Sequence, residues 1–175
     1  MLAYVFWHRP GGDELAAYEA RLTAFHAALA QHPPAGFTGS AALRLQEAPW
    51  LPGDGPAYED WYAVETWEAL GALNEAAVRG ARAEPHDAVA ARARAGAGGV
   101  YRLIDGPAEL AATRTSWLFK PAGADRDAFH EQLSGPGRSL WMRQMVLGPA
   151  PEYAVRSGAP VVLPYDARAI AATPL

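Results

Sequence analysis

The chain has no cysteine, so disulfide bonds, thiolate catalysis and cysteine-bound zinc are all excluded. It has no cluster of lysine and arginine, and its formal charge of −4 is mildly acidic, which argues against nucleic acid as a partner. No segment approaches the roughly 20 apolar residues of a membrane-spanning helix, and the amino terminus lacks the basic and apolar regions of a signal peptide. These absences predict a cytoplasmic protein that binds neither nucleic acid nor membrane.

The sequence also lacks the motifs of common nucleotide-binding and hydrolytic enzymes. It has no Gly-x-Ser-x-Gly turn and no phosphate-binding P-loop. The glycine-rich segment 96–99 precedes an expected strand, whereas a dinucleotide-binding fingerprint follows a strand and opens a helix. We therefore interpret that segment as a linker. His26 and His32 are six residues apart and do not have the i, i+4 spacing of a helical metal pair. We expect no metal site, and the sequence favours no cofactor.

What the sequence does contain is an internal repeat. Residues 2–22 resemble residues 113–133, which lie 111 positions further on, and both segments indicate an aromatic strand, a proline/glycine turn and an amphipathic helix. The alignment pairs four identical residues: Pro10 with Pro121, Gly12 with Gly123, Ala17 with Ala128, and Leu22 with Leu133. Residues 61–65 likewise resemble residues 152–156. A repeat of this kind identifies architecture before it identifies chemistry.

The first unit, which we place at residues 1–107, has the element order β-α-β-β-α-β. Apolar residues from Leu15 to Leu29 recur at helical spacing, and aromatic-rich or alternating runs indicate strands. The predicted strands are residues 2–8, 39–46, 60–67 and 100–104, and the later helices span residues 68–80 and run from Pro85 to about residue 95. This is the order of a ferredoxin-like fold, in which helices cover one face of an antiparallel sheet.

The second unit, residues 108–175, repeats this order only in part. We expect strands at residues 115–120, 140–147 and 153–156, and a helix at residues 125–133. After Gly158 the resemblance between the units fails. Residues 161–163 indicate a short strand and residues 166–172 indicate one or two helical turns. The second unit is thus predicted to be truncated, without a clear second long helix.

The strands are apolar on both sides, which indicates how the two units pack. Tyr4, Phe6 and His8 lie on one side of the first strand, and Val5 and Trp7 lie on the other. A solvated sheet face would be polar throughout. We therefore predict an α+β fold of two tandem ferredoxin-like units, with their antiparallel sheets packed face to face as a barrel in one compact structure.

This element order and its repeated aromatic strand–turn–helix resemble the dimeric α+β barrel superfamily over about residues 2–157. The group includes antibiotic-biosynthesis monooxygenases, haem-degrading monooxygenases, muconolactone isomerases, EthD-like proteins and stress-responsive barrel proteins. The resemblance implies a pocket enclosed by the sheets. Haem-degrading members use an asparagine, a tryptophan and a histidine. The single asparagine here, Asn74, falls in a predicted helix, so that set of residues is not carried over.

Two side chains on predicted strands are candidates for catalytic proton transfer. His8 ends the first strand, and an imidazole titrates near neutral pH. Glu65 lies between Ala63 and Trp67 on one face of the third strand, and an enclosed carboxylate exchanges protons readily near neutral pH. If the units pack pseudo-symmetrically, Glu65 would face Arg156, its counterpart in the repeat. The structural alternatives are a hydrogen-bonded histidine at a strand end and an ion pair at an exposed strand edge.

The candidates for ligand binding combine aromatic rings with two arginines. Flat rings stack on aromatic ligands, and a few polar groups orient a ligand in an apolar pocket. We assign this role to Phe6, Trp61, Trp67, Trp117, Arg143 and Arg156. The alternative for each large aromatic residue is a place in the core. Trp50 differs, because it lies in the proline- and glycine-rich loop 49–56 and is expected to form a lid or an oligomer contact.

These observations leave three functions open. The leading interpretation is a barrel protein that binds a hydrophobic or aromatic small molecule in an aromatic-lined pocket. The alternative is a cofactor-independent monooxygenase or isomerase that acts on an aromatic or polyketide-like substrate. The third is a structural module for self-association, since a truncated second unit would leave a sheet edge or face that favours a homodimer.

Overall fold

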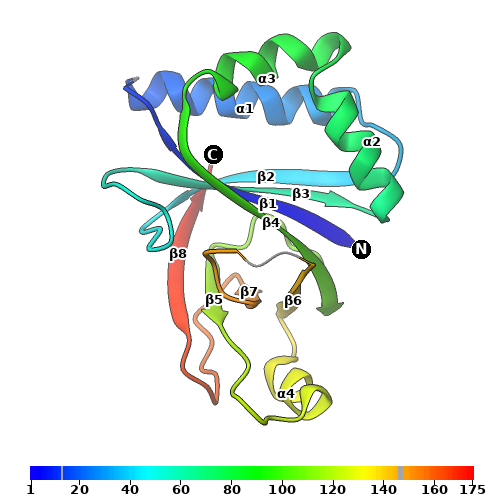
Figure 1. Cartoon of the computed structure of the whole chain (residues 1–175), viewed down its shortest axis with the longest axis vertical. Coiled ribbons are helices and arrows are strands. Elements are labelled where there is room, and N and C mark those ends of the chain that lie inside the picture. Colours follow the sequence, from blue (N-terminus) through cyan, green and yellow to red (C-terminus); the bar gives the residue numbers. More distant parts are fainter. Residues whose placement is uncertain (13, 146–147) are drawn as a thin grey trace.

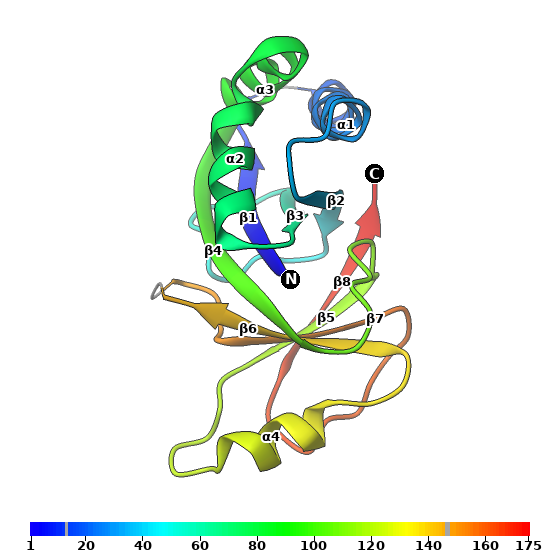
Figure 2. The same ribbon diagram turned by 90° about the vertical axis from the view of Figure 1, so that its right-hand side faces the viewer.

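The computed structural model describes residues 1–12, 14–145 and 148–175. In this part of the chain, eight antiparallel strands close into a barrel, with four α-helices outside it (Figure 1). The predicted α+β class and the barrel are confirmed. Three helices lie together over one side of the barrel, and the fourth lies at the opposite end (Figure 2). None of these helices is long and apolar enough to cross a membrane.

The first half of the chain contributes four strands and three of the helices, in the predicted alternation. Their bounds are β1 Leu2–Pro10, α1 Leu15–Gln31, β2 Phe37–Leu45, β3 Ala57–Val64, α2 Trp67–Ala77, α3 Ala83–Ala90 and β4 Ala93–Asp105. The predicted apolar stripe of α1 is buried against the outer face of the sheet, through Tyr18, Leu22, Phe25 and Leu29. The third strand begins at Ala57, earlier than predicted. It ends at Val64 because the next helix begins just after it: Thr66 caps α2 by accepting a hydrogen bond from the backbone nitrogen of Ala69 at 3.1 Å.

The second half contributes the other four strands and one short helix. Their bounds are β5 Arg114–Leu118, α4 Arg126–Leu133, β6 Arg138–Gln144, β7 Tyr153–Ser157 and β8 Arg168–Pro174. Asp125 caps α4 by accepting hydrogen bonds from the backbone nitrogens of Asp127 and Ala128. The predicted strand 140–147 corresponds to β6, which ends at Gln144, and its residues 146 and 147 lie outside the described part of the chain.

Two predictions near the carboxyl terminus are wrong. Residues 161–163 form no strand, and the helical turns expected at residues 166–172 are replaced by strand β8. The reason is tertiary, because β8 pairs with both β2 and β5 and its Ile170 is buried in the barrel. Within the described residues, the second half has fewer α-helices than the first, one against three, but it has the same number of strands, four.

The glycine-rich segment 96–99 is not a linker but the middle of β4. A Cβ atom on Gly96 would lie 2.7 Å from Cζ of Phe6, and one on Gly98 would lie 2.6 Å from the hydroxyl of Tyr4. The two aromatic rings of β1 lie over the neighbouring strand β4, and only glycine leaves room for them. The glycines thus allow large rings on the outer face of the sheet.

Around the barrel the strands follow the order β1-β3-β2-β8-β5-β7-β6-β4. Each half contributes four neighbouring strands, and the pairs β2–β8 and β4–β6 join the halves. Side chains alternate between two buried environments, as the strand pattern predicts: Val5 and Trp7 point into the barrel, and Tyr4 and Phe6 pack with the helices outside it.

The barrel interior is filled by large aromatic side chains. The main residues are Trp7, Trp61, Tyr101, Trp117 and Trp141, each at most 1% exposed. Neighbouring rings of this group lie 5.2 to 6.2 Å apart between centroids, mostly edge to face. Trp50 packs onto the same group, 5.5 Å from Trp7 and 5.3 Å from Trp117. It therefore extends the core and is not the lid that its loop position predicts.

Candidate functional site

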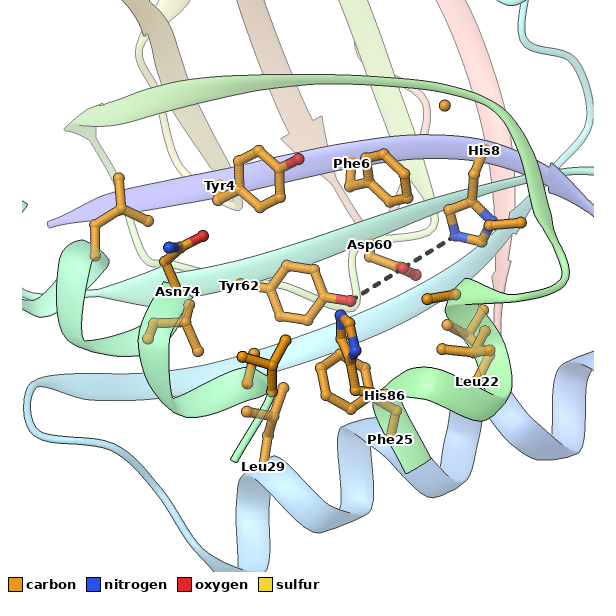
Figure 3. Close-up of a pocket in the computed structure, with 18 of the residues that line it drawn as sticks. Tyr4, Phe6, His8, Leu22, Phe25, Leu29, Asp60, Tyr62, Asn74 and His86 are labelled. Atoms are coloured by element: carbon orange, nitrogen blue, oxygen red, sulfur yellow. Dashed lines mark hydrogen bonds and ion pairs between the residues drawn. The ribbon is translucent and has the colours of Figure 1, made fainter. Parts of the chain in front are cut away.

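A cavity of about 990 Å³ lies between the three helices of the first half and the outer face of β1, β3 and β4 (Figure 3). We call it the helix–sheet cavity. The resemblance to α+β barrels implies a pocket enclosed by the two sheets, but that space is occupied by the tryptophans of the barrel interior. The ligand-sized space is on the other face of the sheet, because short residues alternate with large rings there and the helices stand off from it.

The walls of the helix–sheet cavity are apolar and its sheet side is aromatic. The helices contribute Leu22, Phe25, Leu29, Leu73 and Val89, and the strands contribute Tyr4, Phe6 and Tyr62. A few polar groups line the same space, among them Asn74 of α2 and His86 of α3 (Figure 3). An apolar enclosure with a small number of polar groups is the usual form of a small-molecule site.

Asp60 lies at the bottom of this cavity and is only 2% exposed. Its Oδ2 atom accepts hydrogen bonds from Nε2 of His8 at 3.0 Å and from the hydroxyl of Tyr62 at 3.1 Å, so the carboxylate lies between the two side chains (Figure 3). Its Oδ1 atom is 3.6 Å from Nε2 of His26. Burial alone would raise the pKa of Asp60, but the neighbouring imidazoles of His8 and His26 outweigh it and hold the pKa well below its usual range.

His8 connects Asp60 to a tyrosine of α1. Its Nε2 atom is bonded to Asp60, and its Nδ1 atom lies 2.6 Å from the hydroxyl of Tyr18. An ionised carboxylate can only accept, so Nε2 of His8 carries a proton; in the neutral ring Nδ1 is then the acceptor and Tyr18 donates. The imidazole is held flat between the rings of Phe6 and Tyr58, at centroid distances of 5.1 and 5.6 Å. Its tautomer and orientation are both determined by neighbours.

Of the two predicted catalytic residues, His8 lines the helix–sheet cavity and Glu65 does not. The prediction that Glu65 lies within the third strand is wrong, because β3 ends at Val64 and Glu65 is exposed in the turn before α2. Arg156 is fully buried in the barrel, so the predicted pairing of Glu65 with Arg156 is also wrong. The charged group with the largest influence on the pKa of Arg156 is Glu59, which lies on the barrel face of β3.

The six predicted ligand-binding residues divide between three places. Phe6 and Trp67 line the helix–sheet cavity, and Trp67 does so from the first turn of α2. Trp61, Trp117 and Arg156 lie in the barrel interior. Arg143 donates hydrogen bonds to the backbone oxygens of Gly148 and Ala150, and so ties the residues just before β7 to β6. The structure thus brings only two of the six to the cavity.

The barrel interior contains a second buried polar cluster, around Glu59. Its two carboxylate oxygens accept hydrogen bonds from Nε1 of Trp7 at 2.7 Å and Nε1 of Trp61 at 2.6 Å. Arg156 stacks over the Trp61 ring at 4.0 Å and donates to the backbone oxygens of Glu109 and Leu110 at 2.9 and 3.0 Å. Burial raises the pKa of Glu59 and lowers that of Arg156 to about 10. Through these bonds to Glu109 and Leu110, the cluster holds the segment between β4 and β5 against the barrel.

Sequence reasoning missed Asp60, Tyr18 and His26 as members of the cavity cluster. Tyr18 was expected in the apolar stripe of α1, and its ring is indeed buried there, but its hydroxyl meets His8. The available signal was in β3: acidic residues 59 and 60 stand in a strand that is buried along its whole length. A buried carboxylate requires partners. Asp60 already lies in the predicted strand 60–67 and could have been identified on this ground, and an earlier start for that strand would have added Glu59.

Among the described residues, no group of three or more histidine, aspartate or glutamate side chains is arranged to hold a metal ion. The polar atoms around Asp60 instead form a chain of hydrogen bonds between protein groups. Such an arrangement can orient a ligand and move protons. Comparison with known proteins names no family: no protein-family model matches the sequence, and no curated protein matches it.

Proposed function

We propose that the protein binds an apolar or aromatic small molecule in the helix–sheet cavity. The observation that carries this proposal is the cavity itself, about 990 Å³ in volume, with aliphatic helix walls, an aromatic sheet side and a buried carboxylate at its bottom. Ligand sites typically occupy roughly 300–1,000 Å³ and have this composition. The space is large enough for a compound of several fused rings.

The polar groups of the cavity suggest how a ligand would be oriented. Tyr4, Phe6 and Tyr62 form a row of aromatic rings along the sheet, with neighbouring centroids 6.2 Å apart. A flat ligand would lie against this row and place its polar end near Asp60 or near Asn74 on α2. The buried position of Asp60 favours a ligand group that donates a hydrogen bond or gives up a proton.

We also infer that the two halves are tandem ferredoxin-like units, and that the chain is related to the dimeric α+β barrel superfamily. The strand order supports this inference, since β4-β1-β3-β2 in one half corresponds to β8-β5-β7-β6 in the other. The cytoplasmic location and the homodimer expected from the sequence stay predictions. A cofactor-independent monooxygenase or isomerase would use the same cavity, because its substrates belong to the same aromatic class.

Binding is tested with the fluorescent probe 1-anilinonaphthalene-8-sulfonate and a matched pair of substitutions on α2. Ala77 lines the cavity, and Ala76, equally half-buried on the same helix, does not. Ala77→Phe fills the space and is expected to weaken saturable probe binding at least tenfold, whereas Ala76→Phe leaves it unchanged. Circular dichroism confirms that both variants fold.

Equal probe affinity in the two variants and the unchanged protein would contradict the proposed site. Native and denaturing mass spectrometry of the purified protein provide a second measurement. A mass lost on denaturation identifies a retained ligand, and a retained ligand that Ala77→Phe displaces would give the chemical class directly. A ligand retained equally by Ala77→Phe would place the binding site elsewhere.

A further inference from the structure

We propose that the ligand of the helix–sheet cavity is an anion, an apolar or aromatic carboxylate whose charged group pairs with Arg94 where the cavity opens to solvent. This inference rests on the proposed binding function and adds the chemical class of the ligand to it. The observation behind it is that Arg94 both lines the cavity and is exposed. Arg94 is thereby assigned as a residue that determines which ligands bind.

Among the described residues that line the cavity, Asp60 and Arg94 are the acidic and basic ones, histidines aside. They differ in what a ligand can reach. Asp60 is 2% exposed, and its Oδ2 atom already accepts hydrogen bonds from His8 and Tyr62. Arg94 is exposed, and a guanidinium carries a permanent positive charge. The described part of the lining thus offers an exposed partner for an anion and no exposed acidic side chain for a cation.

The guanidinium of Arg94 is held in place and keeps two donor atoms for a ligand. Its Nη1 atom donates to the backbone oxygens of Ala91 and Ala93 at 3.3 and 2.9 Å, just after α3. Gly11 leaves room for the side chain, since a Cβ atom there would lie 2.5 Å from Cγ of Arg94. Nε and Nη2 have no hydrogen-bond partner among the described residues. These two nitrogens form a side of the planar guanidinium that binds both oxygens of a carboxylate.

A distortion of the sheet lies directly beside Arg94. The register of β1 and β4 shifts there by one residue, so that two residues of β4, Ala95 and Gly96, stand opposite His8 of β1. Ala95 has a φ of 49°, in the left-handed region that favours glycine. Bulges of this kind redirect side chains, and backbone strain concentrates where ligands are held. The strand is therefore strained at the residue that follows Arg94, as expected of a segment that presents a binding side chain.

The rest of the lining determines what the anionic group is attached to. Arg94 pairs with Arg9 near the His8 end of β1, whereas Asn74 lies at the end of the cavity away from His8 (Figure 3). The row of aromatic rings along the sheet lies between these two ends. A ligand that spans the cavity thus has a carboxylate at one end, an apolar or aromatic body, and at the other end the hydrogen-bonding group proposed above.

The test compares two fluorescent probes that differ by one charged group. 1-Anilinonaphthalene-8-sulfonate is an anion, and N-phenyl-1-naphthylamine has the same rings without the sulfonate. Arg94→Gln is expected to weaken binding of the anionic probe about tenfold, because it removes a charge-assisted hydrogen bond. The neutral probe is expected to bind within about twofold of the unchanged protein, because the apolar walls are retained, and its binding shows that the variant folds.

Arg102→Gln is the matched control for this change. Arg102 is an exposed arginine of the same strand, and it donates from Nε to Gln144 at 3.3 Å without lining the cavity. The substitution removes the same charge from the protein. Both probes are expected to bind Arg102→Gln as they bind the unchanged protein, because an exposed charge outside the site is screened by salt.

A second pair of ligands tests the carboxylate itself. 2-Naphthoate and 2-naphthamide have nearly the same shape, and only the first is charged. In displacement of the neutral probe, naphthoate is expected to bind about tenfold more tightly than the amide to the unchanged protein and to Arg102→Gln. The two compounds should bind about equally to Arg94→Gln, which lacks the guanidinium. Equal binding of both compounds to the unchanged protein would show that the carboxylate is the wrong class.

Failure of this inference is distinguishable from failure of the binding proposal. If Arg94→Gln weakens both probes equally, the arginine only supports the end of α3. If Arg102→Gln weakens the anionic probe as much as Arg94→Gln does, only the net charge matters. Either result contradicts the proposed ligand class while binding of the neutral probe still stands. If neither probe binds the unchanged protein, both proposals fall.

Discussion

Glu59 and Asp60 are consecutive residues of β3, yet their carboxylates lie on opposite faces of the sheet and both are buried. Glu59 accepts hydrogen bonds from two indoles inside the barrel, and Asp60 accepts them from His8 and Tyr62 beneath the helices. Burial raises the pKa of Glu59, whereas for Asp60 the histidines outweigh burial and lower it. The two shifts are opposite because only Asp60 has histidine side chains beside its carboxylate.

The lowered pKa of Asp60 predicts a specific dependence of stability on pH. A carboxylate with a depressed folded-state pKa stabilises the fold above its unfolded-state pKa of about 4, and this contribution is lost as the pH falls below that value. Asp60→Asn is therefore expected to destabilise the protein by about 2 kcal/mol at pH 7, because it removes a charged hydrogen-bond acceptor. Urea unfolding at pH 7, 4 and 3 should show this difference shrinking with acidity. A constant difference would mean that Asp60 is not ionised in the fold.

Two tryptophans of one aromatic cluster differ in what their indole nitrogens contact. Nε1 of Trp7 donates to Glu59, whereas Nε1 of Trp50 is buried without a partner among the described residues. Trp7→Phe and Trp50→Phe delete the same atoms, but only the first leaves a buried carboxylate oxygen without its donor. We expect Trp7→Phe to cost about 2 kcal/mol more than Trp50→Phe in urea unfolding. Equal costs would show that the hydrogen bond to Glu59 contributes nothing net.

The carbonyl contacts of Arg156 predict that lysine cannot replace it. Its guanidinium donates to Glu109 and Leu110 and stacks over Trp61, and an ammonium cannot reproduce this planar fork. Arg156→Lys is expected to lower the free energy of unfolding by about 2–3 kcal/mol. The same change at the exposed Arg114 of β5 should stay within about 0.5 kcal/mol. Chemical denaturation of both variants measures the contrast, and a loss at Arg114 as large as at Arg156 would refute it.

Gly96 predicts a link between strand β4 and the volume of the helix–sheet cavity. A Cβ atom there would lie 2.7 Å from Cζ of Phe6, so Gly96→Ala must displace that ring. We expect a destabilisation of about 2 kcal/mol and weaker binding of the fluorescent probe. Gly158→Ala serves as the control, since its Cβ atom would meet nothing within 4 Å. Probe binding as tight in Gly96→Ala as in Gly158→Ala would show that Phe6 does not shape the site.

Local pattern was sufficient for most of the elements and for the two-sided strands. Apolar spacing in α1 and the alternation of Phe6 and Trp7 in β1 depend on neighbours within a few residues, and the structure confirms both. The predictions for the second half were wrong where pairing with strands distant in the sequence determines the secondary structure. Residues 168–174 carry no strong strand signal, and they become β8 because β2 and β5 offer open edges on either side.

The candidate site shows the same division. The sequence by itself singled out His8 and Phe6 and predicted an apolar site with aromatic rings, because these properties follow from residue type and strand position. Tertiary structure alone decided that the tryptophans fill the barrel, and that the cavity lies under the helices instead. It also brought Tyr18, His8 and Asp60 together, from a helix and two strands up to 52 residues apart. Local sequence patterns do not predict these contacts, because they require α1 to pack on one face of a sheet whose register is set by long-range strand pairing.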